Sequence, residues 1–165
     1  MKKRQFLKFG LAAVPLSAVT AVALLPRMRD AAAAEPAFEI TMTENEWRKL
    51  LTPAQFDVLR NEGTERPFTS KLNDEKRAGR YLCAGCQLPL FSSEAKYDSR
   101  TGWPSFYEAL PDAVGISTDY KLILPRTEYH CARCGGHQGH VFDDGPQPTG
   151  KRYCNNGVAL TFEAI

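Results

Sequence analysis

Apolar and polar positions form three different patterns along this 165-residue chain. Residues 9–25 are one apolar stretch, and residues 43–63 carry apolar residues at helical spacing. From residue 64 onward, short apolar runs alternate with Gly, Pro, Asp and Asn. The patterns predict a targeting or membrane-spanning segment, then a short helical region, and then a β-rich domain with many turns.

Two short helices are predicted between residues 43 and 63. Thr43 can cap the first helix, because a glutamate three residues later completes a capping box. Trp47 lies on the apolar face of this helix, and we expect it to pack in the core. Thr52 can cap the second helix, with Pro53 at its first position, and Gly63 should end it.

The rest of the domain is predicted to be mainly β. Five short apolar runs are candidate strands, at residues 79–83, 120–124, 128–131, 140–142 and 158–162. The pattern predicts no long helix in this half, and the two Cys-x-x-Cys pairs are its one internal repeat. It indicates a small antiparallel sheet or barrel-like core with a helical N-terminal cap.

The first 34 residues have the layout of an export signal. Four basic residues precede the apolar stretch, and a run of alanines ending at residue 34 offers a cleavage site to a signal peptidase. We therefore expect a signal peptide at residues 1–34, a linker at 35–43 and the functional domain at 44–165. The alternative is an uncleaved membrane anchor. The stretch has about 17 residues, near the lower limit for a span, and Pro15 interrupts it.

Residues 3–8, Lys-Arg-Gln-Phe-Leu-Lys, resemble the bacterial twin-arginine export signal. Lys3 stands in place of the first arginine, so ordinary secretion stays open. The twin-arginine route carries folded proteins, which would suit a chain that needs a metal before it is stable. By either route, we expect the mature protein to be located in the bacterial periplasm.

Removal of this segment would change the sign of the net charge. Residues 1–34 hold six of the 21 Lys and Arg residues and one of the 19 Asp and Glu residues. The remainder therefore keeps 15 basic and 18 acidic residues. Because nucleic-acid-binding modules normally present a basic face, this mildly acidic domain argues against a nucleic-acid partner.

Four of the five cysteines form two Cys-x-x-Cys pairs, Cys83 with Cys86 and Cys131 with Cys134. Two such pairs are the usual way to offer four thiolates to one tetrahedral Zn²⁺, with no open position for water. We therefore expect a structural zinc site. The same sulfurs could instead hold iron, or form two disulfides in an oxidising compartment. His130 is either a spare ligand or a residue beside the site.

The fifth cysteine, Cys154, is the candidate nucleophile. Arg152 and Asn156 lie two residues to either side, so all three would point to one face of a strand. A cationic neighbour lowers the pKa of a thiol, and an asparagine amide can donate a hydrogen bond to a substrate oxygen. The alternative is an inert, buried cysteine.

Two further motifs carry candidate chemistry. His137 and His140 closely follow the second cysteine pair, so a metal there would hold them rigidly as acid, base or oxygen-binding groups. In the loop 102–106, Trp103 could cup a methyl or sulfur group. The alternative is that both histidines, Trp103 and Phe106 are packed core residues.

Together, these motifs resemble the B-type methionine sulfoxide reductases, which act on the R epimer of the sulfoxide. The resemblance runs from about residue 44 to residue 162. Its landmarks, besides the two cysteine pairs, are Thr-Glu-Arg-Pro-Phe at 64–68, Tyr-Asp-Ser at 97–99, Gly-Trp-Pro-Ser-Phe at 102–106, His-Gln-Gly-His-Val-Phe-Asp-Asp-Gly-Pro at 137–146 and Gly-Lys-Arg-Tyr-Cys-Asn-Asn at 150–156.

The resemblance implies a mainly β fold of two antiparallel sheets, with zinc bound away from the active site. Cys154 matches the nucleophile, which attacks the sulfoxide sulfur, releases methionine and becomes a sulfenic acid. Trp103 matches the residue that packs against the substrate methyl group, and Phe106 is expected to bind substrate beside it. The expected partners are oxidised methionine residues in proteins and a thioredoxin-like or other thiol reductant, and the enzyme is expected to be a monomer.

The remaining site residues match polar groups of the family. His137, His140 and Asn156 match residues that bind water or the sulfoxide oxygen and assist its protonation. Arg152 matches the arginine expected to favour the thiolate. This agrees with the chemistry, because sulfoxide oxygen leaves well only when it is protonated. The site therefore needs a thiolate and a proton source together.

Two departures from the family pattern affect these expectations. Many members carry a resolving cysteine one residue before the Gly-Trp-Pro-Ser-Phe loop, where this chain has Thr101. We therefore expect no intramolecular disulfide, and an external thiol would reduce the Cys154 sulfenic acid directly. The second departure is Asn156-Gly157-Val158, where the family more often has Asn-Ser-Ala, and local packing should differ there.

Two other functions compete with this interpretation. A non-enzymatic zinc-binding module for protein interaction would need neither Cys154 nor Trp103. A thiol peroxidase would use the cysteine without an aromatic cup, so replacing Trp103 would spare a peroxidase and impair a sulfoxide reductase. The presence of both residues in the pattern favours the reductase.

Overall fold

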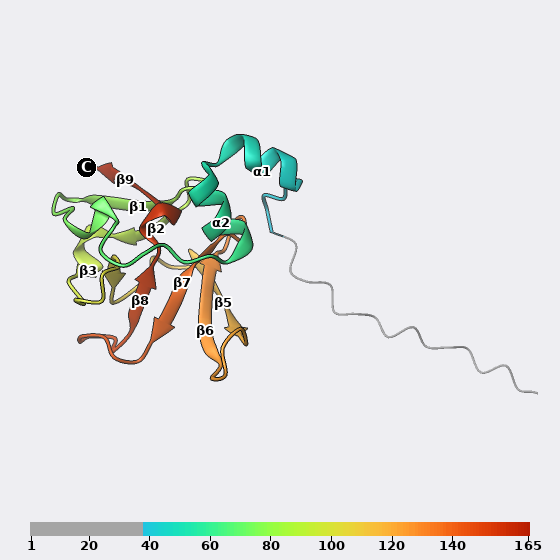
Figure 1. Cartoon of the computed structure of the whole chain (residues 1–165). Helices are drawn as coiled ribbons and strands as arrows, with labels where there is room; N and C mark the ends of the chain where they lie inside the picture. Colours follow the sequence, from blue (N-terminus) through green and yellow to red (C-terminus); the bar gives the residue numbers. More distant parts are fainter. Residues whose placement is uncertain (1–37) are drawn as a thin grey trace, which may run out of the picture. The chain divides into compact units, whose positions relative to one another are not determined.

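The computed structural model describes residues 38–165 of the chain (Figure 1). The expected export signal at 1–34 and the start of the linker at 35–43 lie outside these residues. The cleavage site and the domain boundaries therefore stay predictions. Within the described part, no helix combines the length and the apolar character that a membrane crossing requires.

The described chain opens with two short helices, α1 (Glu44–Leu50) and α2 (Pro53–Asn61). Both begin as predicted, because Thr43 and Thr52 each form a complete capping box with the third helical residue. The second helix ends just before Gly63, as expected, but Glu62 rather than the glycine takes the left-handed conformation, with φ 54°. Trp47 is 3% exposed, which confirms its place in the core.

The first sheet has three antiparallel strands in the order β2–β1–β9, namely β1 (Gly79–Cys83), β2 (Pro89–Ser92) and β9 (Leu160–Ala164). It joins the two ends of the β-rich region, since β9 pairs with β1 along its whole length. The predicted strand 79–83 is confirmed by β1. The predicted strand 158–162 is only partly a strand, because it overlaps the 3₁₀ helix η3 (Gly157–Ala159).

The second sheet has six antiparallel strands in the order β3–β4–β8–β7–β6–β5. They are β3 (Lys96–Tyr97), β4 (Ser105–Phe106), β5 (Val114–Asp119), β6 (Arg126–Cys131), β7 (His137–Phe142) and β8 (Arg152–Asn155). Two more 3₁₀ helices lie in connections, η1 (Lys71–Asn73) and η2 (Ser93–Ala95). The mainly β fold of two antiparallel sheets is confirmed. The expected barrel-like core is not a closed barrel, because both sheets have open edges within residues 38–165.

The predicted strand at 120–124 is wrong. These residues belong to the loop between β5 and β6, and β5 lies earlier in the chain. The apolar run that suggested a strand is exposed to solvent. β5 itself is an edge strand with one neighbour, so it buries little surface and carries few apolar residues. The predicted strands 128–131 and 140–142 lie inside β6 and β7.

Aromatic stacking joins the two sheets. Phe91 of β2 and Phe106 of β4 stack with their ring centroids 4.2 Å apart and their planes at 9°. Tyr81 of β1 meets Phe106 edge-on at 4.9 Å. Such pairs contribute stability beyond the burial of their surface. They hold β4, and with it the neighbouring strand β8, against the three-stranded sheet.

Candidate functional site

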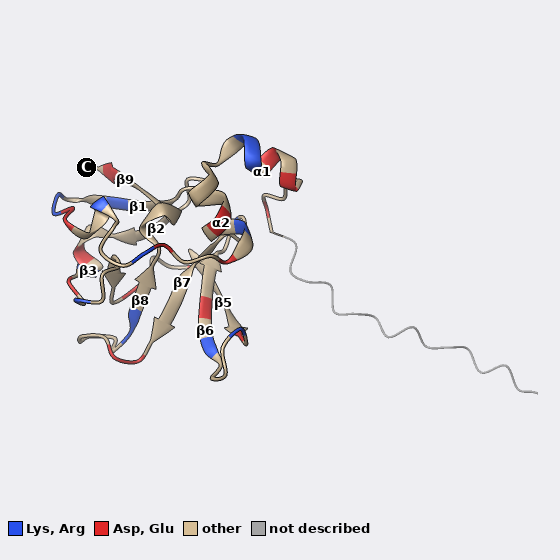
Figure 2. Cartoon of the chain, viewed as in Figure 1, with Lys and Arg blue, Asp and Glu red and all other residues tan. Residues whose placement is uncertain are grey.

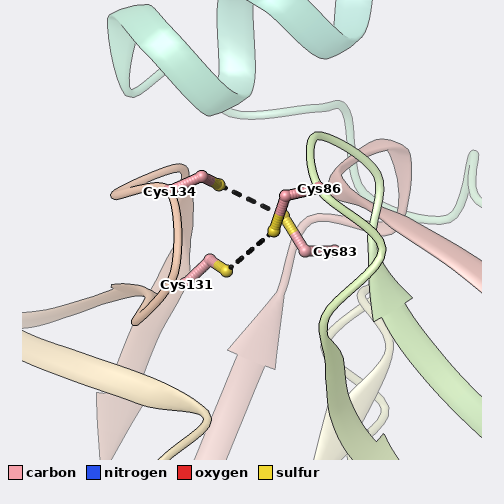
Figure 3. Close-up of side chains that lie close together, drawn as sticks. All are labelled: Cys83, Cys86, Cys131 and Cys134. Atoms are coloured by element: carbon pink, nitrogen blue, oxygen red, sulfur yellow. Dashed lines mark hydrogen bonds between the residues drawn. The ribbon is translucent and has the colours of Figure 1, made fainter. Parts of the chain in front are cut away.

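Four cysteine thiols from two distant turns lie close together. Cys83 ends β1 and Cys131 ends β6, and each turn that follows carries the second cysteine of its pair, Cys86 or Cys134. The four Sγ atoms lie within 4.8 Å of one another (Figure 3). The structure therefore brings together all four predicted metal ligands, although Cys86 and Cys131 are 45 positions apart in the sequence.

The two turns share one backbone geometry. The backbone N–H of Gln87 donates to the carbonyl of Cys83 at 2.8 Å, and that of Gly135 donates to the carbonyl of Cys131 at 2.9 Å. Gln87 and Gly135 both adopt positive φ, at 59° and 66°. Glycine is required at position 135 for two reasons. Its positive φ is unfavourable for other residues, and a Cβ there would overlap the Phe38 ring.

The sulfur positions fit a tetrahedral metal ion rather than two disulfides. The sulfurs of Cys83 and Cys134 are 3.7 Å apart, and those of Cys86 and Cys131 are 3.4 Å apart. Four sulfurs at about 2.3 Å from a tetrahedral centre would be about 3.8 Å apart, whereas a disulfide needs about 2.0 Å. His130 is not part of this group, since its Nδ1 lies 3.0 Å from a Glu128 carboxylate oxygen.

Cys154 lies on β8, within the six-stranded sheet. In the strand register it is directly opposite Ser105 of β4 and His140 of β7, and His140 is opposite Glu128 of β6. Residues directly opposite each other point to one face, with their Cβ atoms about 4.5–5.5 Å apart. The sheet thus places the predicted nucleophile and one predicted histidine side by side.

A pocket of about 120 Å³ opens at this row. Four of the predicted site residues line it, Cys154, His140, Asn156 and Trp103. Trp103 donates its indole N–H to the backbone carbonyl of Glu65 at 3.1 Å, which fixes the ring as one wall. Phe106, predicted to bind substrate, does not line the pocket, because it is fully buried in the aromatic core between the sheets.

Two carboxylates hold the histidines in place. Asp119 accepts hydrogen bonds from His140 Nε2 at 2.8 Å and from Arg126 at 2.6 Å. Glu128 lies 2.7 Å from His137 Nδ1. His137 is 3% exposed and does not line the pocket, but its ring lies 5.5 Å from that of His140. Its Nε2 has no hydrogen-bond partner within residues 38–165.

Burial and charge set the protonation of the site. Burial lowers the pKa of His140 and outweighs the opposing hydrogen bond to Asp119, so the ring is neutral at neutral pH. Burial also raises the pKa of Cys154, although Arg152 acts to lower it, as expected. The charge of Arg152 is shared between Cys154 and Asp144, because Arg152 also donates two hydrogen bonds to Asp144 at 2.8 and 2.9 Å. The resting site therefore pairs a neutral thiol with a neutral imidazole.

Asn156 lies just beyond β8, and both ends of its amide are already bonded. Its Oδ1 accepts the backbone N–H of Glu65 at 3.0 Å, and its Nδ2 donates to the carbonyl of Gln138 at 3.0 Å. The Glu65 carboxylate in turn accepts the backbone N–H groups of Gly157 and Val158. Asn156 and Glu65 thus tie the segment that carries Thr64, a pocket residue, to β7 and η3.

The departure at Gly157 has a packing explanation. A Cβ at this position would overlap the hydroxyl of Ser70, which caps η1 by accepting the backbone N–H of Leu72. The serine that is more frequent in the family therefore cannot fit here while Ser70 keeps its position.

Sequence reasoning missed four charged residues of the site, namely Glu65, Asp119, Arg126 and Glu128. Asp119 and Arg126 form the last residue pair of β5 and β6, and only this pairing brings them to His140. The one available signal was Glu128, an acidic residue at the start of a predicted strand that continues with Tyr129 and Cys131. A carboxylate in such a place needs a partner, and here it has two histidines and Ser117.

Comparisons with known proteins are consistent with this site. The SelR domain model matches residues 51–164. The chain is 52% identical over 125 residues to a peptide methionine sulfoxide reductase MsrB of Methanosarcina barkeri, covering 75% of this chain and 88% of that protein. For an MsrB of Pseudomonas putida the identity is 55% over 126 residues, covering 76% and 95%. A chloroplastic peptide methionine sulfoxide reductase B1 of Arabidopsis thaliana is 50% identical over 126 residues, covering 76% and 62%. This chain therefore belongs to the SelR domain family, together with these MsrB proteins.

Proposed function

We propose that this protein reduces the R epimer of methionine sulfoxide in proteins to methionine, with Cys154 as nucleophile and an external thiol as reductant. The observation that carries the proposal is the pocket in which Cys154 lies opposite His140, beside the fixed indole of Trp103. A thiol, an imidazole and an apolar wall are the three groups that this reaction needs. The names of the family relatives point to the same reaction.

In the first step, the Cys154 thiol passes its proton to His140, and the thiolate attacks the sulfoxide sulfur. His140 keeps a proton on Nε2, which donates to Asp119, so Nδ1 is its basic atom. The imidazolium then protonates the sulfoxide oxygen. The hydroxyl moves to the Cys154 sulfur as the thioether leaves. The substrate gains two electrons, and Cys154 becomes a sulfenic acid.

Two molecules of an external thiol then restore Cys154. The first forms a mixed disulfide with Cys154 and releases the sulfenic oxygen as water. The second attacks the external sulfur of that bond, which releases a disulfide and the Cys154 thiol. An external thiol is needed because Thr101 stands beside Cys154 and the four other cysteines form the metal-ligand group.

For the four-cysteine group we propose Zn²⁺ with a structural role. Such an ion would supply four metal–sulfur bonds that hold the turn after β1 to the turn after β6. Metal analysis of the purified protein should give one zinc per chain. Removal of the metal by a chelator should lower the melting temperature, and Cys131→Ser should do the same. Iron in place of zinc, or an unchanged melting temperature, would contradict this assignment.

Separate assays with the R and S epimers of N-acetyl methionine sulfoxide amide, with dithiothreitol, test the reaction. We expect turnover of the R epimer only, complete loss in Cys154→Ser and a raised KM in Trp103→Ala. Leu50→Ser, an exposed position on α1, is the matched control and should not change activity. No turnover by a folded, metal-loaded protein would favour a non-enzymatic zinc module. Reduction of hydrogen peroxide that is indifferent to Trp103→Ala, with no turnover of either sulfoxide epimer, would favour a peroxidase.

We also propose that the protein is exported to the bacterial periplasm and acts there as a monomer. The support for export is the signal-peptide layout of residues 1–34, within which residues 3–8 resemble a twin-arginine signal. Cell fractionation should find a shortened chain in the periplasm, and this should depend on the basic residues before position 9. Retention in the cytoplasm, or a full-length membrane-bound chain, would contradict export. Size-exclusion chromatography would test the oligomeric state.

A further inference from the structure

Four large apolar side chains are exposed together in the loop between β5 and β6. Tyr120, Leu122, Ile123 and Leu124, here called the apolar tip, are 75%, 57%, 101% and 76% exposed. Single exposed apolar residues are ordinary, whereas a contiguous exposed group marks an interaction site. The apolar tip is therefore a candidate docking surface.

The loop that carries the apolar tip begins and ends beside the pocket. At its base, Asp119 pairs with Arg126, which lines the pocket, and Asp119 also binds His140. Lys121, which lies between two residues of the tip, forms an ion pair with Glu62 at 2.7 Å. Glu62 is two residues before Thr64, another residue that lines the same pocket. The apolar tip thus adjoins the rim of the pocket.

The size of the pocket leaves most of a polypeptide substrate outside it. Its volume of about 120 Å³ suits a single side chain. The residues on either side of an oxidised methionine must then lie across the rim. Because the loop that carries the apolar tip starts at this rim, those residues are within its reach.

The charges around the apolar tip are neutralised. Each of the three charged side chains between residues 119 and 126 has a partner of opposite sign, Asp119 with Arg126 and Lys121 with Glu62. Acidic and basic residues are also interspersed over the elements in view in Figure 2. A neutral apolar surface matches apolar side chains, and it lacks the free cations that bind anionic lipids or nucleic acids.

Resting on the proposed function, we propose that the apolar tip docks the polypeptide that carries the oxidised methionine and selects segments with apolar side chains next to it. The surface acts on binding and not on the chemical step. It should therefore change KM for peptides, while kcat and the reduction of a small substrate stay the same.

The test compares three substrates as R epimers, all with dithiothreitol. These are N-acetyl methionine sulfoxide amide, a peptide with valine and leucine beside the oxidised methionine, and a matched peptide with serine and glycine there. For the unmodified protein we expect a KM about ten-fold lower for the apolar peptide than for the polar one, since burial of one or two methyl groups suffices for this. The combined variant Leu122→Ser, Ile123→Ser, Leu124→Ser should abolish this difference.

Two controls keep the outcomes separate. The variant should retain its kcat and its kcat/KM for the amide, and Leu50→Ser, with an equally exposed leucine on α1, should retain the peptide preference. If the amide is reduced but the combined variant keeps its preference for the apolar peptide, the docking inference is overturned and the proposed function stands. If no substrate is reduced, the proposed function fails and the inference with it. Binding to phosphatidylcholine vesicles that is lost in the variant, without any peptide preference, would assign the apolar tip to a membrane surface and overturn the inference.

Discussion

The hydroxyl oxygen of Thr101 lies 4.0 Å from the sulfur of Cys154. Ser99 holds this hydroxyl at 2.9 Å and is itself 2.7 Å from the hydroxyl of Ser105 on β4. A chain of three hydroxyl groups therefore lies beside the Cys154 sulfur. None of these groups can form a disulfide, so under the proposed function a thiol from solution would reduce the Cys154 sulfenic acid.

The substitution Thr101→Cys should give the protein an internal resolving thiol. The new sulfur would start close to the Cys154 sulfur, and attack on the sulfenic acid would form a disulfide and release water. Mass spectrometry after one turnover without reductant should find a disulfide between Cys154 and the introduced thiol in the variant. The unmodified protein should give a dimedone-labelled sulfenic acid instead. Thr101→Ser is the control and should behave like the unmodified protein. Full dimedone labelling of Thr101→Cys would show that the two groups do not meet.

Substitutions at Arg152 and Asp144 should shift the reactivity of Cys154 in opposite directions. Arg152 lowers the pKa of the thiol and Asp144 raises it, while burial keeps the pKa above its usual value of 9.0. The rate of alkylation by iodoacetamide should therefore rise with pH through a midpoint above 9. At pH 8, Arg152→Gln should react more slowly than the unmodified protein, and Asp144→Asn should react faster.

Quantification of the alkylated Cys154 peptide checks this, with Cys154→Ser as the blank. Equal rates in both variants would mean that the Arg152–Asp144 pair only supports the end of β8. A midpoint near neutral pH in the unmodified protein would mean that burial does not control this thiol.

Local rules predicted the parts of this protein that depend on neighbouring residues in the sequence. Capping boxes at Thr43 and Thr52 and the two Cys-x-x-Cys turns needed no knowledge of the fold. The strand prediction at 120–124 was wrong because this exposed loop has the apolar composition that is typical of a buried strand. Asp119 could not be placed beside His140 from sequence, since the contact depends on β5 pairing with β6 and β6 with β7. Phe106 could not be separated from Trp103, because the sequence does not show which of the two aromatic rings faces the core.

Gly157→Ser should destabilise the fold by about 1–3 kcal/mol, the usual cost of overpacking. The new side chain would overlap Ser70, whose Oγ and Cβ both lie within contact of a Cβ at position 157. Ser70→Gly removes both atoms. The double variant Ser70→Gly, Gly157→Ser should therefore recover part of the loss, and this coupling energy can be measured by urea unfolding of the four proteins. Additive effects of the two substitutions would show that the strain at position 157 has another source.

Glu128→Gln should reduce the sensitivity of the fold to acid. Burial raises the pKa of Glu128, but hydrogen bonds with His130, His137 and Ser117 outweigh it and lower the pKa from 4.5 to about 2. A carboxylate with a lowered pKa stabilises the fold fully above its unfolded pKa, and this contribution is lost as the pH falls from about 5 towards 2. The lowering corresponds to about 3 kcal/mol, since one pKa unit is equivalent to about 1.4 kcal/mol.

The free energy of unfolding of the unmodified protein should therefore exceed that of Glu128→Gln by the largest amount above pH 5, and the two should converge as the pH approaches 2. Loss of the proposed metal at low pH would affect both proteins alike, so the difference between them isolates the carboxylate. Glu108→Gln, at an exposed position outside this network, is the matched control and should follow the unmodified protein at every pH. A difference that stays constant from pH 7 to pH 2 would mean that Glu128 contributes through shape and hydrogen bonding alone. The position of His137 would then be independent of the charge on Glu128.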